Sequence, residues 1–465
     1  MSAGQDFSRA RRRVLAHLPA LPALLLGTSG CGGTAFTEEG AVPGLRLSAS
    51  IDLGEAYAGS SINAASFREQ SIIALTGGGH AVGYFDARGD ACLAVLAADG
   101  VLRRTIRVDP PLTARLLADG HCGINLGRTE AGVVVVMYGA HGNAAVALAV
   151  DEGLLQNGPL PARLAGALWP PLITYPQFYQ LGGRLQLWYR SDPDNTVQSI
   201  ECDDGIGNAT GAPRALLVAD GDVRPYMNQL AVNGQTVALS WMYRVPSTDG
   251  LVHNEGLYLA LSDDGGRHWR RRSGEALALP ITRAALQPEI DVPSLSRWPL
   301  NQTASCFAPD GNLLISLHAR DAAGVPQIHL VRCATTGTGQ PQTEVVSDNT
   351  NRFELDGAGS LWLPLSRPQL AASADQIHVI YRQGERLVIA SRRHLNPAGA
   401  WVRRIVTTAA LGAWEPSVCR ETWARRGILL VYVQPVRQGP ADTEAAGPPT
   451  SAQVLVFENL TNPPQ

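Results

Sequence analysis

The sequence contains no lysine, so all 38 of its basic residues are arginine. Only 17% of the residues are charged, and the formal net charge is −3. This balance offers no basic surface of the kind that binds nucleic acid. An apolar stretch near the N-terminus, residues 14–26, is broken by two prolines and too short to cross a membrane, and no other segment could do so. We therefore expect neither a nucleic-acid partner nor a membrane-spanning protein.

Several sequence motifs of common enzymes and metal sites are also missing. The chain has no Cys-x-x-Cys pair, no His-Glu-x-x-His and no Gly-x-Ser-x-Gly, which argues against a cysteine zinc cage, a zincin and an α/β-hydrolase. Six cysteines follow the first 31 residues, and six allow 15 pairings, so the sequence does not fix any disulfide. They are Cys92, Cys122, Cys202, Cys306, Cys333 and Cys419.

One short sequence motif recurs seven times along the chain. It consists of a turn residue, an alternating apolar run, and an aromatic or charged end. The copies are residues 79–86, 132–138, 183–190, 234–244, 311–320, 375–382 and 427–434. Such a period of roughly 50 to 80 residues indicates one supersecondary unit used repeatedly. The units hold several short β-runs and no convincing amphipathic helix, and the 48 glycines suit a chain rich in turns. We therefore predict an all-β fold, a seven-bladed β-propeller over residues 65–465.

The first 31 residues have the features of an export signal. Arginines at positions 9 and 11–13 precede a short apolar stretch, and Cys31 follows Gly30. This pattern resembles a bacterial lipoprotein signal with Cys31 as the lipidated residue. A plain secretory cut, a twin-arginine signal and a disordered tail are the alternatives. We expect an exported protein that touches a membrane only through a lipid anchor, with residues 32–64 as a linker and closing strand.

Residues 262–269 match the Asp box, Ser-x-Asp-x-Gly-x-x-Trp, at every defined position. Asp264 can accept backbone N–H bonds in the turn, Gly266 allows an unusual φ, and Trp269 can pack between blades. We interpret this segment as a fold marker at a turn between third and fourth strands, away from any functional site.

Strand direction predicts which polar residues meet. In a propeller blade the start of the first strand and the end of the second lie on the same face. The residues expected at one mouth of the central channel on this basis include His121, His141, Tyr175, Arg190, Tyr226, Arg244, Asn301, Arg320, Arg367, Arg382 and Glu415. Such a ring of arginines with His and Tyr is a pocket for an anionic ligand. The alternative is that each arginine caps its own blade, which we favour for Arg320 and Arg382 taken singly.

The order of several motifs resembles the BNR-repeat proteins that include the ulvan lyases, over residues 65–434. The resemblance rests on residues 82–86, His121 with His141 twenty residues later, 174–178 leading to 188–190, 224–226, 301–303, 367–368 and 414–417. It implies a polysaccharide lyase that cleaves a uronate-containing, ulvan-like acidic polysaccharide. The catalytic residues it implies are His121, His141, Tyr175 and Arg190, and we expect substrate binding by Tyr226, Arg244, Asn301, Arg320 and Arg367.

The chemistry of β-elimination explains why these residue types occur together. Arginine can neutralise the uronate carboxylate with a bidentate contact, and a neutral imidazole can take the C5 proton near pH 7. Tyr175 can protonate the leaving oxygen, and we expect the neighbouring arginine to lower its pKa from about 10. This chemistry requires no cofactor, although the sequence leaves room for a structural metal ion. We expect a monomer.

Two other functions compete with the lyase. One position departs from the family pattern, because Cys122 follows His121 where an asparagine is usual. This departure keeps open a non-catalytic carbohydrate-binding surface lipoprotein. The Asp box suggests a sialidase-type glycoside hydrolase as a lower alternative, but a glycosidase usually needs paired carboxylates, and the expected mouth offers mainly Glu415.

Overall fold

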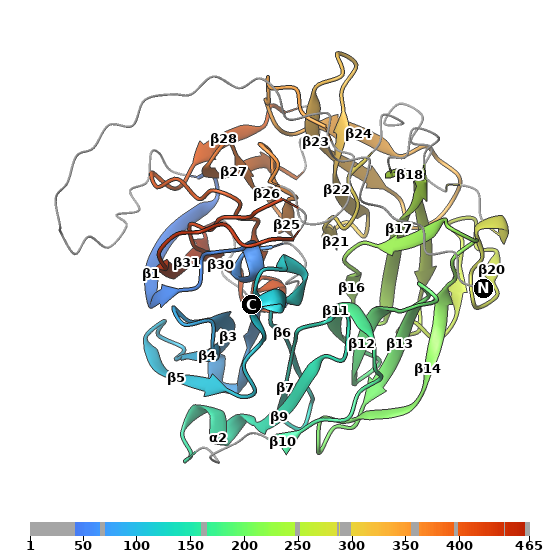
Figure 1. The fold of residues 1–465 in the computed structure, drawn as a ribbon. Coiled ribbons are helices and arrows are strands. Elements are labelled where there is room, and N and C mark those ends of the chain that lie inside the picture. Colours follow the sequence, from blue (N-terminus) through green and yellow to red (C-terminus); the bar gives the residue numbers. More distant parts are fainter. Residues whose placement is uncertain are drawn as a thin grey trace, which may run out of the picture. The chain divides into compact units, whose positions relative to one another are not determined.

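The computed structural model describes residues 42–65, 70–159, 165–246, 252–285, 288, 299–354, 362–394, 399–440 and 442–460. In these residues the strands form seven antiparallel sheets, which surround a common centre when seen along the channel (Figure 1). The predicted seven-bladed β-propeller is confirmed. Cys31 and the rest of the predicted export signal lie outside the described residues.

Each of the first four blades runs outward from the centre. Blade 1 consists of β2 (Ile72–Ala74), β3 (His80–Phe85), β4 (Ala91–Leu96) and β5 (Leu102–Val108). Blade 2 consists of β6 (Asn125–Arg128), β7 (Val133–Tyr138), β9 (Val146–Asp151) and β10 (Ala165–Gly166). Blade 3 consists of β11 (Ile173–Leu181), β12 (Arg184–Ser191), β13 (Val197–Cys202) and β14 (Ala209–Leu217), and β8 (His141–Asn143) adds to its inner edge. In blade 4, β15 (Arg224–Met227) and β16 (Ala231–Asn233) both pair with β17 (Thr236–Pro246), followed by β18 (Val252–Ser262), β19 (Trp269–Arg270) and β20 (Ala276–Leu277).

The last three blades follow the same plan, and the seventh closes the ring. Blade 5 consists of β21 (Ser305–Phe307), β22 (Leu313–Arg320), β23 (Pro326–Cys333) and β24 (Gln342–Val345). Blade 6 consists of β25 (Gln369–Ala372), β26 (Gln376–Gln383), β27 (Arg386–Arg393) and β28 (Val402–Ile405). Blade 7 consists of β29 (Ser417–Val418), β30 (Ile428–Val433), β31 (Thr450–Asn459) and the N-terminal β1 (Leu45–Ala56) as its outer strand. Strands from both ends of the propeller therefore share one sheet.

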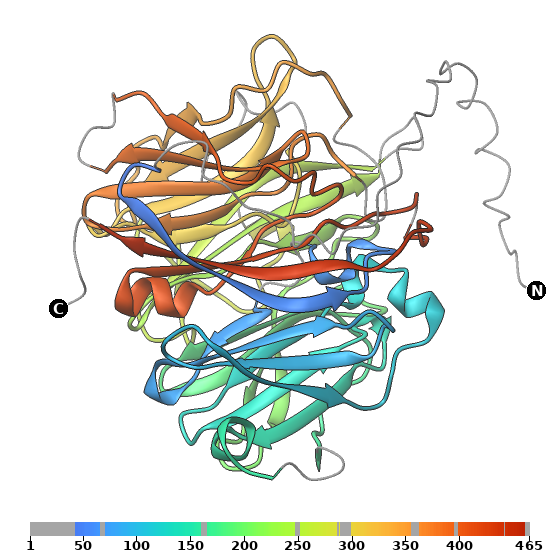
Figure 2. The ribbon, with the colours of Figure 1, turned by 90° about the vertical axis from the view of Figure 1, so that its left-hand side faces the viewer.

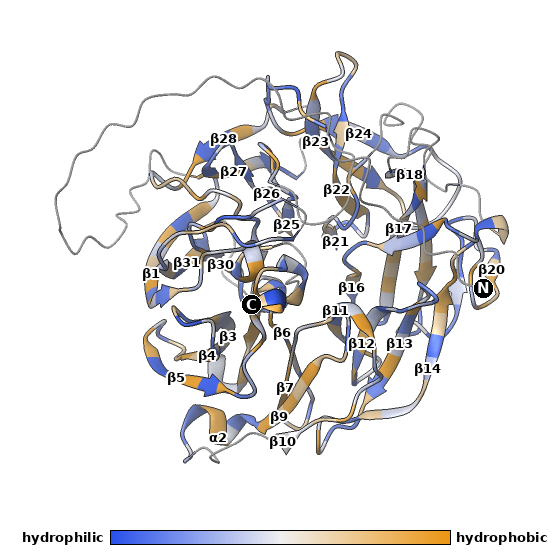
Figure 3. Cartoon of the chain, in the orientation of Figure 1, coloured by the Kyte–Doolittle hydropathy of each residue, from blue (hydrophilic) through white to orange (hydrophobic). Residues whose placement is uncertain are grey.

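The recurring sequence motif forms the second strand of every blade. These strands are β3, β7, β12, β17, β22, β26 and β30. All six residues of β7 are buried, because blades pack face to face and cover both sides of the strand. The outer strand β5 instead alternates buried and exposed residues. The outer strands β5 and β28 carry both blue, hydrophilic and orange, hydrophobic segments (Figure 3).

The core is divided among the interfaces between neighbouring blades. One apolar cluster joins Phe85 and Leu93 of blade 1 to Val134 of blade 2, and another joins blade 7 to blade 1 through Leu430 and Val82. At the blade 3–4 interface, the indole of Trp269 lies 6.0 Å from that of Trp188 in an edge-on arrangement. Each blade therefore depends on both neighbours for burial of its apolar surface.

The turn before Trp269 is held by the side chain of Asp264. Its Oδ1 accepts the backbone N–H groups of Arg267 (3.0 Å) and His268 (2.9 Å). Gly266 has φ +85°, which suits glycine at this tight turn. The turn connects β18 to β19, so it lies between the third and fourth strands of blade 4 as predicted.

Short helices lie at the two ends of the channel. The helix α1 (Ala114–Leu117) precedes the 3-10 turn η3 (Gly120–Cys122), and α3 (Arg420–Arg426) follows the inner strand of blade 7. The view from the side places α1, in cyan, and α3, in red-orange, at opposite faces of the ring (Figure 2). The connections between strands also contain three 3-10 turns and one helix. These are η1 (Ser61–Asn63), η2 (Thr76–Gly78), η4 (Arg283–Ala285) and α2 (Glu152–Gln156). None of the helices in the described part of the chain is both long and apolar enough to span a membrane.

Candidate functional site

A carboxylate holds two histidines at one mouth of the channel. Asp119 precedes η3 and accepts the backbone N–H of His121 at 2.9 Å. Its Oδ1 lies 2.6 Å from Nδ1 of His121, and its Oδ2 lies 2.5 Å from Nδ1 of His141. The two imidazole rings stack with their centroids 4.0 Å apart. Asp119 thus fixes both rings in one orientation.

The short strand β8 brings His141 across from blade 2 to blade 3. His141 pairs with Thr174 at the inner edge of β11, and the Thr174 hydroxyl accepts the N–H of Gly142 at 2.7 Å. The same hydroxyl donates to Asp192, directly after β12, at 2.5 Å. The start of one blade's first strand is therefore tied to the end of its second, as strand direction predicts.

Tyr175 takes an unusual backbone conformation next to the histidines. Its φ is +56°, and the pairing of β11 with β12 shifts between Thr174 and Gln177. It costs free energy to hold a tyrosine in this left-handed region, and residues with such strained backbones are often found at functional sites. The Tyr175 ring lies 5.5 Å from that of His121 and 6.2 Å from that of His141, between centroids. The irregular part of β11 therefore places the Tyr175 ring beside the histidine pair.

Arg190 lies between two tyrosine rings with part of its guanidinium unsatisfied. Its guanidinium carbon is 5.0 Å from the ring centroid of Tyr175 and 4.9 Å from that of Tyr226. The side chain is buried, and its nearest carboxylate oxygen, on Asp192, is 3.8 Å away. Among the described residues, Nε and Nη1 of Arg190 have no hydrogen-bond partner. A buried cation with unused donors is costly unless a ligand anion completes it.

The electrostatics of the Asp119 cluster favour a neutral His121. Burial lowers the pKa of His121 below its ordinary value, and His141 adds to this effect, although Asp119 opposes it. Burial acts to raise the pKa of Asp119, but the hydrogen bonds from the two histidines outweigh it and hold that pKa well below the usual range. An ionised carboxylate can only accept, so Nδ1 of each imidazole carries the proton. In neutral His121 the lone pair is then on Nε2.

The two tyrosines differ, and the expectation of a lowered pKa for Tyr175 is wrong. Burial and the neighbouring Tyr226 raise the pKa of Tyr175 beyond what the arginines can offset. Burial also acts to raise the pKa of Tyr226, but Arg190 and Arg244 outweigh it and lower that pKa. Arg244 places Nη1 3.5 Å from the Tyr226 hydroxyl. Tyr175 therefore stays protonated, and Tyr226 is the more acidic phenol.

Arg367 and Asn301 join the mouth from two further blades. The Arg367 side chain bonds to the Asn301 carbonyl (3.0 Å) and to the Glu415 carboxylate (3.2 Å), and its charge acts on Tyr175. Gln302, beside Asn301, has φ +59°, so a second mouth residue is in the left-handed region.

Two of the arginines in the predicted ring are held by their own surroundings. Arg320 pairs with Glu354 at 2.6 Å and bonds to the Phe353 carbonyl at 3.1 Å. Arg382 is fully buried and donates to three backbone carbonyls, one of them that of Trp414 at 2.8 Å. These contacts are the ones expected of arginines that cap their own blades, which is the alternative favoured for these two residues from sequence.

The sequence argument missed Asp119 as a member of the site. An acidic residue two positions before a candidate base was visible in the sequence, but only the 3-10 turn shows that its carboxylate reaches both imidazoles. Asp442 was missed as well; its Oδ1 lies 3.7 Å from Nδ1 of His121, and it too has a positive φ, of +59°. No sequence signal connects a residue so far along the chain with this turn.

The same cluster could also bind a divalent cation. One ligand atom from each of Asp119, His121 and His141 lies within 4.8 Å of the others, and two imidazoles with a carboxylate are a donor set that zinc accepts. A cation there would occupy the positions of the two Nδ1 protons. At this mouth, Arg190 with its two unused donors is the group suited to hold a carboxylate.

Comparison with known proteins identifies the family. The sequence model of the BNR repeat-containing family matches residues 81–343, more than half of the chain. The chain belongs to the BNR repeat-containing family. The comparison with curated proteins gave no match.

Among solved structures, a polysaccharide lyase described as an ulvan lyase of a new family has the same fold. It superposes with a TM-score of 0.65 at 15% sequence identity, covering 88% of this chain and 96% of that chain. A second structure of that lyase, with the same scores, is bound to a unit written -[GlcA(1-4)Rha3S]-. At this identity the likeness establishes the propeller fold of this BNR-repeat protein and no more.

Proposed function

We propose that this protein is a polysaccharide lyase that cleaves a uronate-containing acidic polysaccharide by β-elimination. The observation that carries the proposal is Arg190, a buried cation with two unused donors beside the protonated phenol of Tyr175. A uronate carboxylate would supply the missing acceptors in a bidentate contact. The His121 imidazole, fixed by Asp119, completes the set of groups that β-elimination needs.

In the proposed reaction Arg190 neutralises the carboxylate and makes the C5 proton more acidic. Nε2 of His121 takes that proton, and the electron pair of the C5–H bond forms the C4=C5 double bond. The C4–O bond breaks, and Tyr175 donates its hydroxyl proton to the leaving oxygen. The products are an unsaturated uronate and a new sugar end, and proton exchange with solvent restores His121 and Tyr175.

The finer proposal is an ulvan-like substrate, which alternates a uronate with a sulfated sugar. It is supported by the resemblance of motifs and by the glucuronate–sulfated rhamnose unit bound to the lyase of the same fold. Arg244 and Arg367 flank the tyrosines and are the groups we expect to meet further anionic substituents.

A non-catalytic carbohydrate-binding protein is the second candidate, and Cys122 favours it. Cys122 is fully buried in the apolar cluster between blades 1 and 2, so it offers no donor at the mouth where the family usually has asparagine. A glycoside hydrolase fits less well. Of the carboxylates at the mouth, Asp119 is occupied by two imidazoles, Glu415 by Arg367 and Asp192 by the Thr174 hydroxyl, and Asp442 lies 3.7 Å from His121.

A screen of uronate polymers distinguishes these functions. Ulvan, alginate, pectate and a glucuronan are each incubated with the protein, and absorbance of the unsaturated uronate, new reducing ends and polymer binding are recorded. The lyase proposal predicts absorbance and new ends rising together on at least one polymer. Binding without new ends would support the carbohydrate-binding protein, and new ends without absorbance would support a hydrolase.

We also propose export with a lipid on Cys31, on the strength of the basic, apolar and Gly-Cys regions of residues 1–31. Mass spectrometry of the N-terminus of the protein from a bacterial host tests it. A soluble product that begins elsewhere would contradict the lipid anchor.

A further inference from the structure

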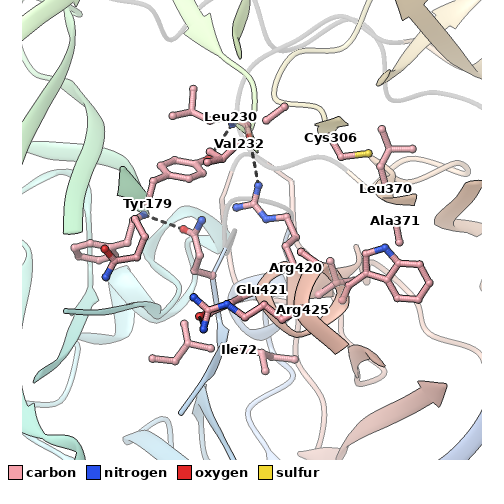
Figure 4. A pocket seen from close by; sticks show the side chains of 18 of the residues that line it. Ile72, Tyr179, Leu230, Val232, Cys306, Leu370, Ala371, Arg420, Glu421 and Arg425 are labelled. Atoms are coloured by element: carbon pink, nitrogen blue, oxygen red, sulfur yellow. Dashed lines mark hydrogen bonds and ion pairs between the residues drawn. The ribbon is translucent and has the colours of Figure 1, made fainter. Parts of the chain in front are cut away.

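A cavity of about 310 Å³ lies at the other end of the channel from the histidines. Its walls come from the ends of the inner strands and from α3 (Figure 4). Tyr175 is near the start of β11, whereas Phe178 and Tyr179 of the cavity wall are near its end. At about 3.3 Å per residue, the four positions from Tyr175 to Tyr179 span roughly 13 Å of strand. The cavity is therefore separate from the proposed active site.

The lining of this α3 cavity is largely apolar and partly aromatic. The residues involved include Ile72, Phe178, Leu230, Phe307, Leu370 and Trp423. Trp423 is buried and its indole N–H donates to the Ala372 carbonyl at 2.8 Å, so its polar atom is already satisfied. The volume falls at the lower end of the range for small-molecule sites. Such walls suit a flat apolar group and offer few of the donors and acceptors that a sugar ring requires.

One cation in this cavity has no acidic partner. Nη1 of Arg420 donates to the Leu230 carbonyl at 3.3 Å, the contact drawn in Figure 4, and its guanidinium carbon lies 5.4 Å from the Tyr179 ring centroid. Among the described residues, no carboxylate oxygen lies within 4.0 Å of Arg420. A half-buried guanidinium facing an apolar wall is stabilised by an anion that accepts its remaining N–H groups.

The other charges around the cavity are already paired. Glu421 lies 3.0 Å from Arg425 and 3.9 Å from Arg128, and Arg128 also reaches Glu152 at 3.3 Å. The Tyr179 platform is fixed as well, because its hydroxyl accepts the N–H of Leu230 at 3.0 Å. Arg420 is therefore held in place before any ligand binds, with a single positive charge to offer.

We propose that the α3 cavity binds a small aromatic carboxylate, with the carboxylate on Arg420 and the ring against the apolar wall. A cation would meet the like charge of Arg420, and a dianion would meet the carboxylate of Glu421. This site is independent of the proposed lyase activity, because it needs neither the histidines nor Arg190.

Calorimetric titration of the mature protein with benzoate, phenylacetate and indole-3-acetate tests the proposal. Saturable binding of at least one is expected, and its amide counterpart, which has the same ring without the charge, should bind at least about tenfold more weakly. Arg420→Gln should weaken binding of the carboxylate by a similar factor. Val232→Trp, at the exposed rim, should also block the cavity without removing the cation.

Arg426→Gln is the matched control, because Arg426 lies on the same helix α3, does not line the cavity and donates to the Gly78 carbonyl at 3.2 Å. This variant should bind the carboxylate as the wild type does. Thermal melts of all variants establish that they fold. Absence of saturable binding for all three carboxylates, or equal binding by wild type and Arg420→Gln, would overturn the proposal.

Discussion

The Oδ1 atom of Asp119 lies 2.6 Å from Nδ1 of His121, and the same carboxylate holds His141 through its other oxygen. This contact sets the tautomer of His121, because Asp119 can only accept. The proposed base therefore depends on a residue that touches no substrate.

The first prediction concerns this positioning role. Asp119→Asn keeps the shape but lets the amide donate, so His121 can adopt the wrong tautomer. We expect kcat to fall roughly 100- to 10,000-fold with little change in KM. Initial rates of unsaturated-product formation measure this. Asp99→Asn, at an exposed ion pair with Arg103, should leave the rate unchanged. Wild-type kcat in Asp119→Asn would exclude the positioning role.

The second prediction concerns Arg190. Arg190→Lys keeps the charge but loses the bidentate fork, so a loss of roughly 30- to 1000-fold in kcat/KM is expected. Arg184→Lys is the control on the same strand, because Arg184 is exposed at the far end of β12. Equal loss in both variants, or none in either, would mean that Arg190 does not hold the carboxylate.

The third prediction separates the two tyrosines. Arg190 and Arg244 lower the pKa of Tyr226 although burial opposes them, whereas burial raises that of Tyr175. Tyr226 should be the first of the two to ionise as pH rises. Ultraviolet difference spectra of wild type, Tyr226→Phe and Tyr175→Phe should show the early transition missing only in Tyr226→Phe. Its persistence there would show that another phenol is the acidic one.

A further prediction concerns Tyr175 as the residue that protonates the leaving oxygen. Tyr175→Phe removes the proton donor and should lower kcat at least about 100-fold, with an unchanged melting temperature. A wild-type rate in Tyr175→Phe would assign the leaving-group proton to another residue.

The fourth prediction is the pH dependence. His121 acts as a base only when neutral, and burial lowers its pKa below the ordinary value of 6.5. Activity should thus be lost as pH falls through a pKa below 6.5 and should be level near neutrality. The pH profile of kcat/KM measures this limb. A limb above pH 6.5 would show that His121 is not the neutral base of this account.

The fold could be predicted because the second strands repeat the same pattern. Their burial on both faces makes them continuous apolar runs, as in β7 and β30, and strand direction then places Tyr175 and Arg190 on one face. Most of the inner strands are short, as in β29 with two residues, and carry too little pattern to be delimited from sequence.

The rest of the site depends on contacts that sequence does not reveal. Arg320 ends β22 and Arg244 lies near the end of the equivalent strand β17, yet Glu354 engages the first and Tyr226 the second. The raised pKa of Tyr175 follows from burial that only the folded channel shows. Asp119 reaches both histidines because a 3-10 turn and the short β8 bring them together.

Proton NMR of ulvan oligosaccharides after incubation with the protein tests the central claim most directly. The account predicts a signal from the vinylic proton on C4 of an unsaturated uronate. This signal should grow in equal molar amount with new reducing ends, and it should be strongly reduced in Arg190→Lys. New reducing ends without that signal, or no cleavage of ulvan or of any other uronate polymer, would contradict it.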